Sequence, residues 1–370
     1  MNRFNFSLLL VFSGCFWTAT YAQNRAIEFP DIPGYRTLKC DFHIHSVFSD
    51  GSVWPDIRVQ EAVKDGLDAI SLTEHLEYQP HGADLPHPDR NRSYQIAKEL
   101  AKPYDLLVIH GAEITRRLPP GHSNAIFIRD ANKLNVKDSV EAFREANRQG
   151  AFVFWNHPSW IAQQTNGVAT LTDLHKMLID EGLLHGIEAV NDLTYSDEAL
   201  QIALDRNLTI MGTSDIHGLV DWQFRLDMGG HRPINLVFAT DKSEEAIKEA
   251  MFAHRTIAWF DNLLVGREDV LIPLVKASLL VRKASYLGPS SVARVEIENV
   301  SDATFLLKNH SGFTLHNGAD IITLAPHETT TVDVKTLEQL TYFPLSVEVL
   351  NAVSAPNVHP MLALEINVDL

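Results

Sequence analysis

The chain has 370 residues, more than one ordinary domain needs, and 45% of them are apolar, enough for a large buried core. It has 47 Asp and Glu residues against 31 Lys and Arg residues, which gives a formal net charge of −16. Proteins that bind nucleic acid usually carry a basic patch, so this balance predicts no nucleic-acid partner. The chain also has 17 histidines, a high count, and their positions carry most of the functional signal.

The first 22 residues have the pattern of a secretory signal peptide: a basic start, a short apolar core and Ala22 at the expected cleavage point. The apolar core is too short to cross a membrane and no later run is longer, so no transmembrane segment is expected. We therefore predict a periplasmic or secreted protein. A second hypothesis stays open, because the sequence FSGC resembles a lipoprotein cleavage site and would anchor the chain through lipid on Cys15. Cleavage after Ala22 would leave Cys40 as the only cysteine, which excludes an intrachain disulfide.

Between residue 37 and about residue 268, short apolar runs alternate with amphipathic runs. The apolar runs have the β-branched and aromatic residues that are typical of buried parallel strands. Seven strands are predicted, at 38–45, 67–75, 106–115, 124–129, 151–157, 186–191 and 209–215. Repeated strand-then-helix units indicate an α/β domain with a parallel sheet, either open or closed into a barrel.

Helices are expected between most of these strands. Apolar residues recur at helical spacing at 59–66 and again at 136–146. Ser196 and Ser243 are each followed by two acidic residues, which is the chemistry of a helix N-terminus. Helices are therefore predicted at 196–206 and 243–254.

The pattern changes after about residue 270, where no further amphipathic helix is expected. Short strand-like runs follow, some of them separated by turn-prone sequences, at 278–283, 293–297, 304–307, 329–334, 346–349 and 362–368. This pattern predicts a small all-β sandwich. The chain is thus divided into a signal peptide at 1–22, an α/β domain at 23–270 and a β-sandwich domain at 271–370.

Histidines and carboxylates gather at or near the ends of the predicted strands. Residues two apart on a strand point to the same face, so His43 and His45 project together, as do Asp215 and His217. The carboxyl ends of parallel strands meet at one mouth of a β/α fold, so side chains from separate segments are expected to meet there. The others are Asp50, His75, Glu113, His122 and His157. Imidazole and carboxylate are ligands of Zn²⁺, Mn²⁺ and Fe²⁺, and burying so many of them without cations would be costly. The sequence therefore predicts a metal centre.

The motifs HxHSxxSDG, TEH, GxE, GHxN, NHP and SDxH occur in this order between residues 37 and 268. Together they resemble the motifs of the PHP (polymerase and histidinol phosphatase) superfamily. The resemblance implies a distorted seven-stranded β/α barrel, here followed by the small β-sandwich domain, as in secreted two-domain members. It also implies two or three divalent metal ions, which would be Zn²⁺, Mn²⁺ or Fe²⁺.

The same resemblance implies three metal sites. The first would be held by His43, His45, Glu113 and Asp215. Glu113 would bridge to a second metal ion, completed by His122 and His157. Asp50, where some family members have His, would hold the third together with His75 and His217.

The implied activity is hydrolysis of a small organic phosphate, a monoester or a diester, by a hydroxide that bridges two metal ions. Glu113 and Asp215 would then act at the reaction centre. Arg116, three residues after Glu113, is the cationic side chain that we expect to contact the phosphate. Asn156 and Glu188 are expected to orient metal ligands. Trp160 lies near His157 and either packs in the core or stacks on an organic group.

Two alternatives stay open at the level of the sequence. One is a barrel metallohydrolase that acts on an amide or a carboxyl ester, because such enzymes also begin with an HxH pair. The other is a surface binding protein whose β-sandwich holds a glycan or a protein partner. Turnover that disappears with the metal would distinguish these hypotheses, whereas the native metal and the oligomeric state are not readable from the sequence.

Overall fold

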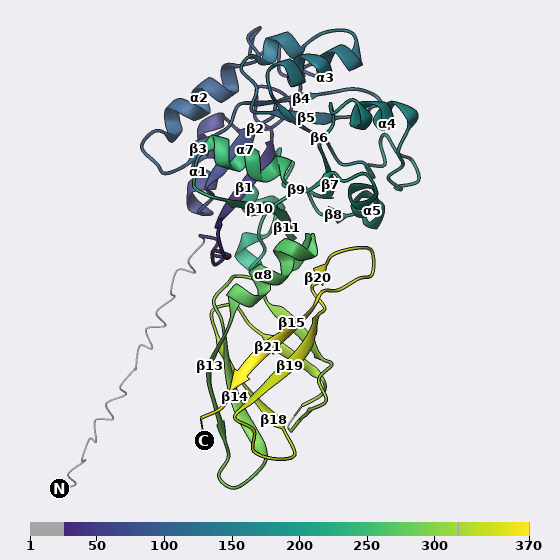
Figure 1. Cartoon of the computed structure of the whole chain (residues 1–370). Coiled ribbons are helices and arrows are strands. Elements are labelled where there is room, and N and C mark those ends of the chain that lie inside the picture. Colours follow the sequence, from purple (N-terminus) through teal and green to yellow (C-terminus); the bar gives the residue numbers. More distant parts are fainter. Residues whose placement is uncertain (1–25, 317, 370) are drawn as a thin grey trace, which may run out of the picture.

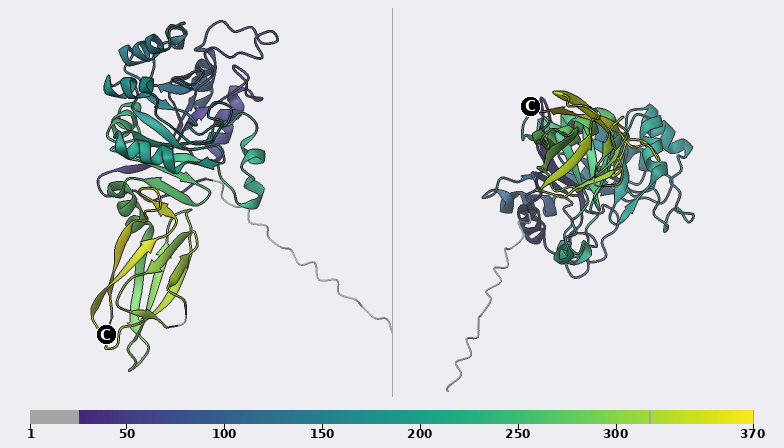
Figure 2. Two further views of the ribbon diagram at one scale, coloured as in Figure 1. Left: turned by 90° about the vertical axis from the view of Figure 1, so that its right-hand side faces the viewer. Right: turned by 90° about the horizontal axis from the view of Figure 1, so that it is seen from below.

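The computed structural model describes residues 26–316 and 318–369, so the predicted signal peptide and Cys15 lie outside the described residues. Two bodies are stacked end to end, one with most of the helices and one formed by strands alone (Figure 1). They keep this arrangement in a view turned by 90° (Figure 2). Within the described residues, no helix combines the length and the apolar character that a membrane crossing requires.

All seven strands predicted for the first domain are present, the third of them split in two. They are β1 (Arg36–Ile44), β2 (Ala69–Leu72), β3 (Leu107–Val108) with β4 (Gly111–Ile114), β5 (Ser123–Ile126), β6 (Phe152–Trp155), β7 (Gly186–Asn191) and β9 (Thr209–Thr213). β1 pairs in parallel with β2, and β7 pairs in parallel with both β6 and β9. Single parallel bridges join His75 to Glu113 and Ile44 to Ile216. These bridges connect the two sheets into the predicted distorted barrel, whose buried core includes Phe42, Phe152 and Phe154.

The fourth strand runs against the predicted direction. β5 pairs antiparallel with both β4 and β6. The connection between β4 and β5 is too short for the crossover that parallel neighbours require. The start of β5, rather than its end, therefore lies at the mouth, and His122 immediately precedes this start.

In the described part of the first domain, four further strands were not predicted. β10 (Ile234–Ala239) pairs antiparallel with β1, and β11 (Thr256–Phe260) and β12 (Leu263–Gly266) continue the same sheet. A short hairpin strand, β8 (Thr194–Tyr195), pairs with the end of β7. The sheet that contains β1 is therefore wider than the barrel itself.

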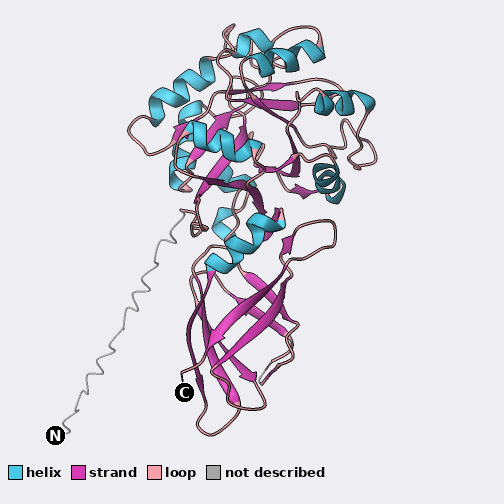
Figure 3. Ribbon diagram, in the orientation of Figure 1, coloured by secondary structure: helices cyan, strands magenta, loops and turns pink. Residues whose placement is uncertain are grey.

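Helices surround the strands of the first domain (Figure 3). They are α1 (Pro55–Lys64), α2 (Arg92–Ala101), α3 (Ser139–Arg148), α4 (Asp173–Asp180), α5 (Asp197–Asp205), α6 (Val220–Gln223) and α7 (Glu244–Phe252), with 3-10 turns η1 (Ala131–Leu134) and η2 (Leu226–Met228). The predicted N-caps are confirmed: the Ser196 hydroxyl accepts from the backbone N–H of Ala199, and the Ser243 hydroxyl accepts from that of Ala246.

The second domain is the predicted β-sandwich. One sheet contains β13 (Leu279–Tyr286), β14 (Val292–Asn299), β18 (Thr329–Lys335) and β16 (Thr314–Leu315). The other contains β17 (Ile321–Leu324), β15 (Phe305–Asn309), β19 (Tyr342–Val349) and β21 (Met361–Asn367). Buried and exposed residues alternate along β19, which is the pattern of a strand with one face on a core.

Helix α8 (Glu268–Ser278) leads directly into β13, and the boundary expected at 270 falls inside it. It was missed because its sequence, EDVLIPLVKAS, is apolar over most of its length and contains Pro273, so its helical period is hidden. A second connection comes from the sandwich, where β20 (Ala352–Val353) pairs with β12 of the barrel sheet. Next to it, the Asn351 amide donates to the carbonyls of Asn262 and Thr304.

Candidate metal centre

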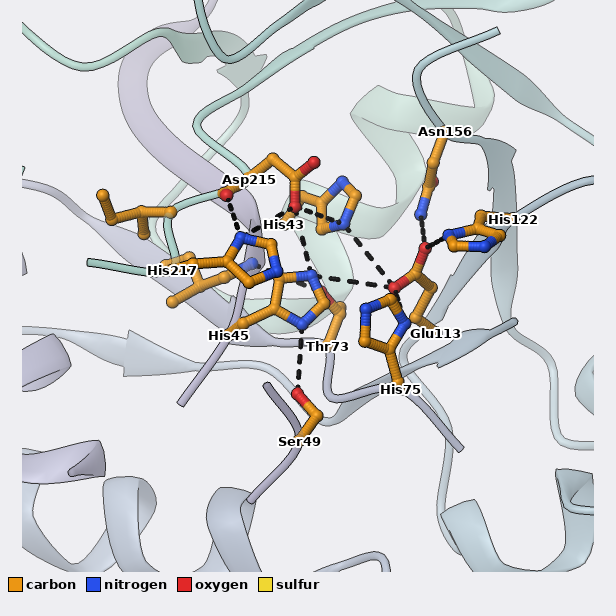
Figure 4. A network of polar contacts seen from close by, with 12 residues as sticks. His43, His45, Ser49, Thr73, His75, Glu113, His122, Asn156, Asp215 and His217 are labelled. Atoms are coloured by element: carbon orange, nitrogen blue, oxygen red, sulfur yellow. Dashed lines mark hydrogen bonds and ion pairs between the residues drawn. The ribbon is translucent and has the colours of Figure 1, made fainter. Parts of the chain in front are cut away.

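The structure brings all nine predicted metal ligands together at the mouth of the barrel. They come from strands and loops that are far apart in the sequence, and seven of them are seen in one network of polar contacts in Figure 4. Asp50 joins this network through His75 and His217, and His157 joins it through Glu113. Within the described residues, three overlapping groups of side chains have the spacing of a metal site. They are His43, His45 and Asp215; His75, Glu113 and His122; and His45, Asp50, His75 and His217, while His157 lies outside these groups and faces Glu113.

The first group is centred on Asp215. Its Oδ1 lies 3.1 Å from Nε2 of His43 and 3.1 Å from Nε2 of His45. Glu113 Oε2 lies 3.9 Å from the first of these nitrogens and 3.7 Å from the second. Atoms that share a tetrahedral Zn²⁺ at about 2.0–2.2 Å lie roughly 3.3–3.6 Å from one another. The four atoms are buried, and none has a hydrogen-bond partner of acceptable geometry among the described residues.

The second group uses the other oxygen of Glu113. Oε1 lies 2.8 Å from His122 Nδ1 and 3.8 Å from His157 Nε2. The Asn156 amide, which was expected to orient a ligand, donates to the same oxygen over 3.0 Å. Glu113 can therefore serve two ions at once, one through each oxygen (Figure 4).

The third group is built around Asp50. Its Oδ1 lies 3.1 Å from His217 Nε2, and its Oδ2 lies 3.4 Å from His75 Nε2. The groups are not separate, because His75 also contacts Glu113 Oε2 through its Nδ1, at 2.5 Å. The ring of His45 similarly lies between Asp215 and Asp50.

Buried carboxylates and hydroxyls fix the histidine rings. Glu188 Oε1 lies 2.8 Å from His43 Nδ1, so this nitrogen donates and Nε2 presents its lone pair to the mouth. Glu188 also accepts from the backbone N–H of His157 and from Thr213. The predicted orienting role of Glu188 thus has a structural basis in three bonds.

The loop after β1, which carries the predicted ligand Asp50, also orients His45. Ser49 Oγ lies 3.2 Å from His45 Nδ1 and donates to Glu74 Oε2 over 2.5 Å. The turn needs Gly51, because a Cβ there would lie 2.8 Å from backbone atoms of His45 and Ser46. Ser49 is the second serine of the HxHSxxSDG motif, although no orienting role was predicted for it, whereas Glu74 is next to His75 in the sequence and bonds to Ser46 and Ser49.

The ionised carboxylates of the centre favour the binding of cations. Burial alone would lower the pKa of His43, but the carboxylates of Asp215 and Glu188 raise it to about 10. Burial alone would raise the pKa of Glu113, but His75 and its neighbouring imidazoles hold it well below the usual range. The carboxylates therefore stay ionised and attract positive charge, so metal binding would displace protons from the imidazoles.

Arg116 is the one predicted catalytic residue that the structure does not bring to the ligand cluster. Its guanidinium lies 2.7 Å from Glu77 and donates to the carbonyl of Val136. Trp160 is 45% exposed and its ring lies beside those of His122 and His157, so it is a surface residue at the mouth rather than a core residue.

The donor set fits divalent metal ions. It combines imidazole nitrogens with carboxylate oxygens, as Zn²⁺, Mn²⁺ and Fe²⁺ sites do. Six of its atoms are buried without a hydrogen bond of acceptable geometry among the described residues, one each from His43, His45, Asp50, Glu113, His122 and Asp215. Burying such atoms without a partner is unfavourable, and a cation would satisfy them all.

A crystal structure from Bacteroides vulgatus is similar over nearly the whole length. It is described as a two-domain protein containing a predicted PHP-like metal-dependent phosphoesterase. The two sequences are 43% identical, the TM-score is 0.87, and the similarity covers 92% of this chain and 98% of the other. The chain belongs to this two-domain PHP-like family. Its fold and the resemblance noted in its motifs are thereby confirmed.

Other matches are shorter or more distant. The DUF5001 family model, described as an Ig-like domain, matches residues 279–365, which lie in the β-sandwich of this PHP-like protein. An uncharacterized protein of Methanocaldococcus jannaschii is 35% identical over 85 residues. The match spans 22% of this chain and only 36% of that curated relative. A structure from Bifidobacterium adolescentis, at 18% identity and a TM-score of 0.39, is too distant to support a conclusion.

Proposed function

We propose that this PHP-like protein is a metal-dependent hydrolase of phosphate monoesters or diesters. One observation carries the proposal: buried nitrogens and oxygens of His43, His45, Glu113 and Asp215 converge at 3.1–3.9 Å, and none of these atoms has a hydrogen bond of acceptable geometry among the described residues. The description of the Bacteroides vulgatus relative as a predicted phosphoesterase supports the choice of substrate class.

The nine residues would hold two or three ions in the groups described above. Bound divalent cations supply water that is activated at neutral pH, and they neutralise charge on a phosphate. Glu113 is the central ligand, since each of its oxygens faces a different group. Asp215 positions its Oδ1 between two imidazoles, and Glu188 keeps the proton of His43 on the nitrogen that faces away from the mouth.

Arg116 has no direct role in this proposal, because Glu77 already pairs with its guanidinium. Trp160 has a side chain exposed beside two of the ligands and offers a surface for the organic part of a substrate. The signal-like N-terminus supports a periplasmic or secreted location, with lipid attachment at Cys15 as the alternative.

The test is hydrolysis by the chain from residue 23 to 370, stripped of metal and then reloaded with Mn²⁺ or Zn²⁺. The substrates are an aryl phosphate monoester, an aryl phosphate diester and an aryl carboxyl ester. His43→Ala removes one ligand, and His310→Ala is the matched control, because His310 pairs with Glu348 on the surface of the sandwich.

We expect metal-dependent cleavage of a phosphate ester that His43→Ala abolishes and His310→Ala leaves unchanged. Cleavage of the carboxyl ester alone would contradict the proposal and favour the other class of barrel metallohydrolase. Metal binding without any turnover would instead favour a binding protein, which a search for partners of the β-sandwich would then test.

A further inference from the structure

The barrel is weakly closed at the place where two metal ligands are attached. Between β1 and the chain after β9 there is one single bridge, in which the backbone N–H of His45 donates to the carbonyl of Ile216 over 3.1 Å. Residues 214–218 follow β9, carry Asp215 and His217, and contain no helix or named strand. Asp215 also has a positive φ of 48°, which is strained for a residue other than glycine. Contacts from outside this segment must therefore hold it in place.

Arg58 supplies three of these contacts from a single side chain. It belongs to α1 and its side chain is fully buried. It donates to one backbone carbonyl just after β1 and to three carbonyls of residues 214–218, which we call the closing segment. The acceptors are His45 at 2.8 Å, Ile216 at 3.2 Å, His217 at 2.8 Å and Gly218 at 2.7 Å. One guanidinium thus connects the HxH strand to the SDxH segment, and no sequence pattern predicts this connection.

The partner of Arg58 strengthens the same connection. Glu61 lies one turn further along α1 and pairs with the guanidinium at 2.8 Å. Its other oxygen accepts from the backbone N–H of Val220, just after the closing segment. Both side chains of the pair therefore hold the same stretch of chain.

A second buried arginine holds the beginning of the segment. Ser214 donates to Asp41 through its hydroxyl and its backbone N–H, at 2.5 and 3.2 Å. Asp41 is fully buried and pairs with Arg232 at 3.3 Å. The segment that carries Asp215 and His217 is thus held at its end by Arg58 directly and at its beginning by Asp41, which Arg232 neutralises.

We propose that Arg58 is a positioning residue of the metal centre, which fixes His45, Asp215 and His217 relative to one another; this inference rests on the proposed function. A guanidinium donates through a rigid planar fork, so it can set the spacing of several carbonyls at once. A buried ion pair is weak evidence for stability, because removing two charges from water costs about as much as their attraction returns. Four bonds to ligand-bearing backbone give this arginine a different role, which is geometric.

The test compares Arg58→Met, Arg58→Lys and the matched control Arg267→Met in the chain from residue 23 to 370. Arg267 also donates to backbone carbonyls, those of Ala203 and Leu208, but they lie away from the ligands. Equilibrium dialysis against Co²⁺ and Mn²⁺ gives the ions bound per chain and their affinity. The visible absorption spectrum of the Co²⁺ form reports ligand geometry, and thermal unfolding reports stability.

We expect Arg58→Met to weaken metal binding by about 10- to 100-fold, the range for loss of a residue that supports metal ligands, and to change the Co²⁺ spectrum. Arg58→Lys should recover part of the affinity. Arg267→Met should unfold at a lower temperature yet bind metal like the unmodified chain. If Arg58→Met does not fold, Arg58→Lys alone decides, by the same comparison with Arg267→Met.

Unchanged affinity and an unchanged Co²⁺ spectrum in the folded Arg58 variant would overturn the inference while leaving the proposed function intact. Failure of the unmodified chain to bind either ion would overturn the proposed function itself, and the inference with it.

Discussion

The two domains bury different kinds of residue. In the barrel, the buried set includes Asp41, Arg58, Glu113, Glu188 and several histidines, whereas no Asp, Glu, Lys, Arg or His is buried in the described part of the sandwich beyond residue 279. Burying charge is costly unless it is paired or binds a metal ion. The barrel is therefore less stable than an apolar core would make it, in exchange for a reactive mouth. The described part of the sandwich buries apolar side chains and a few neutral polar ones such as Asn299, and no charged ones.

The largest expected effect follows from removing the carboxylate that the candidate sites share. Glu113→Gln keeps the shape of the side chain but removes the charge that faces two groups of imidazoles. We expect fewer ions per chain and a loss of turnover greater than about 100-fold, beyond the usual cost of losing an outer-shell partner. Metal analysis and kinetics on the reloaded chain measure both.

Glu348→Gln is the matched change in the sandwich. Glu348 also pairs with a histidine, His310, but at the surface. The Glu348→Gln substitution should leave the metal content and the turnover of the chain unaltered. Equal losses in the two variants would show that the barrel's carboxylate has no special role.

The reverse experiment removes a large side chain from the sandwich core. Phe305 is fully buried in β15, so Phe305→Ala should reduce the free energy of unfolding by about 3–5 kcal/mol. Urea denaturation measures this, with Leu337→Ala, at a site 87% exposed, as the control. Metal affinity measured well below the unfolding midpoint should not change. A fall in affinity would mean that the sandwich shapes the mouth, and the comparison between the domains would have to be revised.

Much of the contrast between the barrel and the sandwich could be predicted from the sequence, because the strands of both domains follow simple patterns of apolar and polar residues. The continuous apolar run of β6 predicts a strand buried on both faces. The alternation of apolar and polar residues along much of β19 predicts a strand with one face exposed to solvent. The ligand candidates were visible because chemically distinctive residues stand at strand ends. The direction of β5 was missed, although the short connection between the third and fourth predicted strands already excludes a parallel pair.

The residues that support the ligands were harder to predict. A role for Glu188 in orienting a ligand could be predicted because this residue lies on a strand of the barrel. Arg58 could not, because an arginine in an amphipathic helix has the pattern of a surface residue, and only the barrel's closure places backbone carbonyls within its reach. Arg116 shows the opposite error, since proximity to Glu113 in the sequence did not place its guanidinium among the ligands.

A third prediction concerns a buried histidine of the barrel that lies outside the ligand set. Burial lowers the pKa of His175 to about 4, while its Nε2 contacts the carbonyl of Pro120. Its Nδ1 accepts from the backbone N–H of Thr172 in the capping box of α4, which protonation would break. The unfolded chain takes up this proton near pH 6.5, so stability falls as the pH drops from about 6.5 toward 4.

Between pH 7.5 and pH 5, this one group should cost about 2 kcal/mol of unfolding free energy. His175→Gln keeps an acceptor that suits the capping box and does not titrate. Urea denaturation of the metal-stripped chain measures the unfolding free energy at both pH values. The loss of unfolding free energy between pH 7.5 and pH 5 should be about 2 kcal/mol smaller for the variant than for the unmodified chain. An identical pH dependence in the two proteins would show that His175 does not titrate in this range.

The smallest effect should come from a helix cap on the outside of the barrel. Ser243 accepts from the backbone N–H of Ala246 at the start of α7, away from the mouth, so Ser243→Ala should reduce the unfolding free energy by about 1 kcal/mol. Ser243→Asp restores an acceptor and should restore most of the stability. Because the cap touches no ligand and no residue that orients one, metal affinity should be the same in all three proteins. A change of affinity with so small a loss of stability would mean that the outer helices of the barrel are coupled to its mouth. The barrel would then respond to any perturbation as a unit, and its difference from the sandwich would be one of cooperativity rather than of buried charge alone.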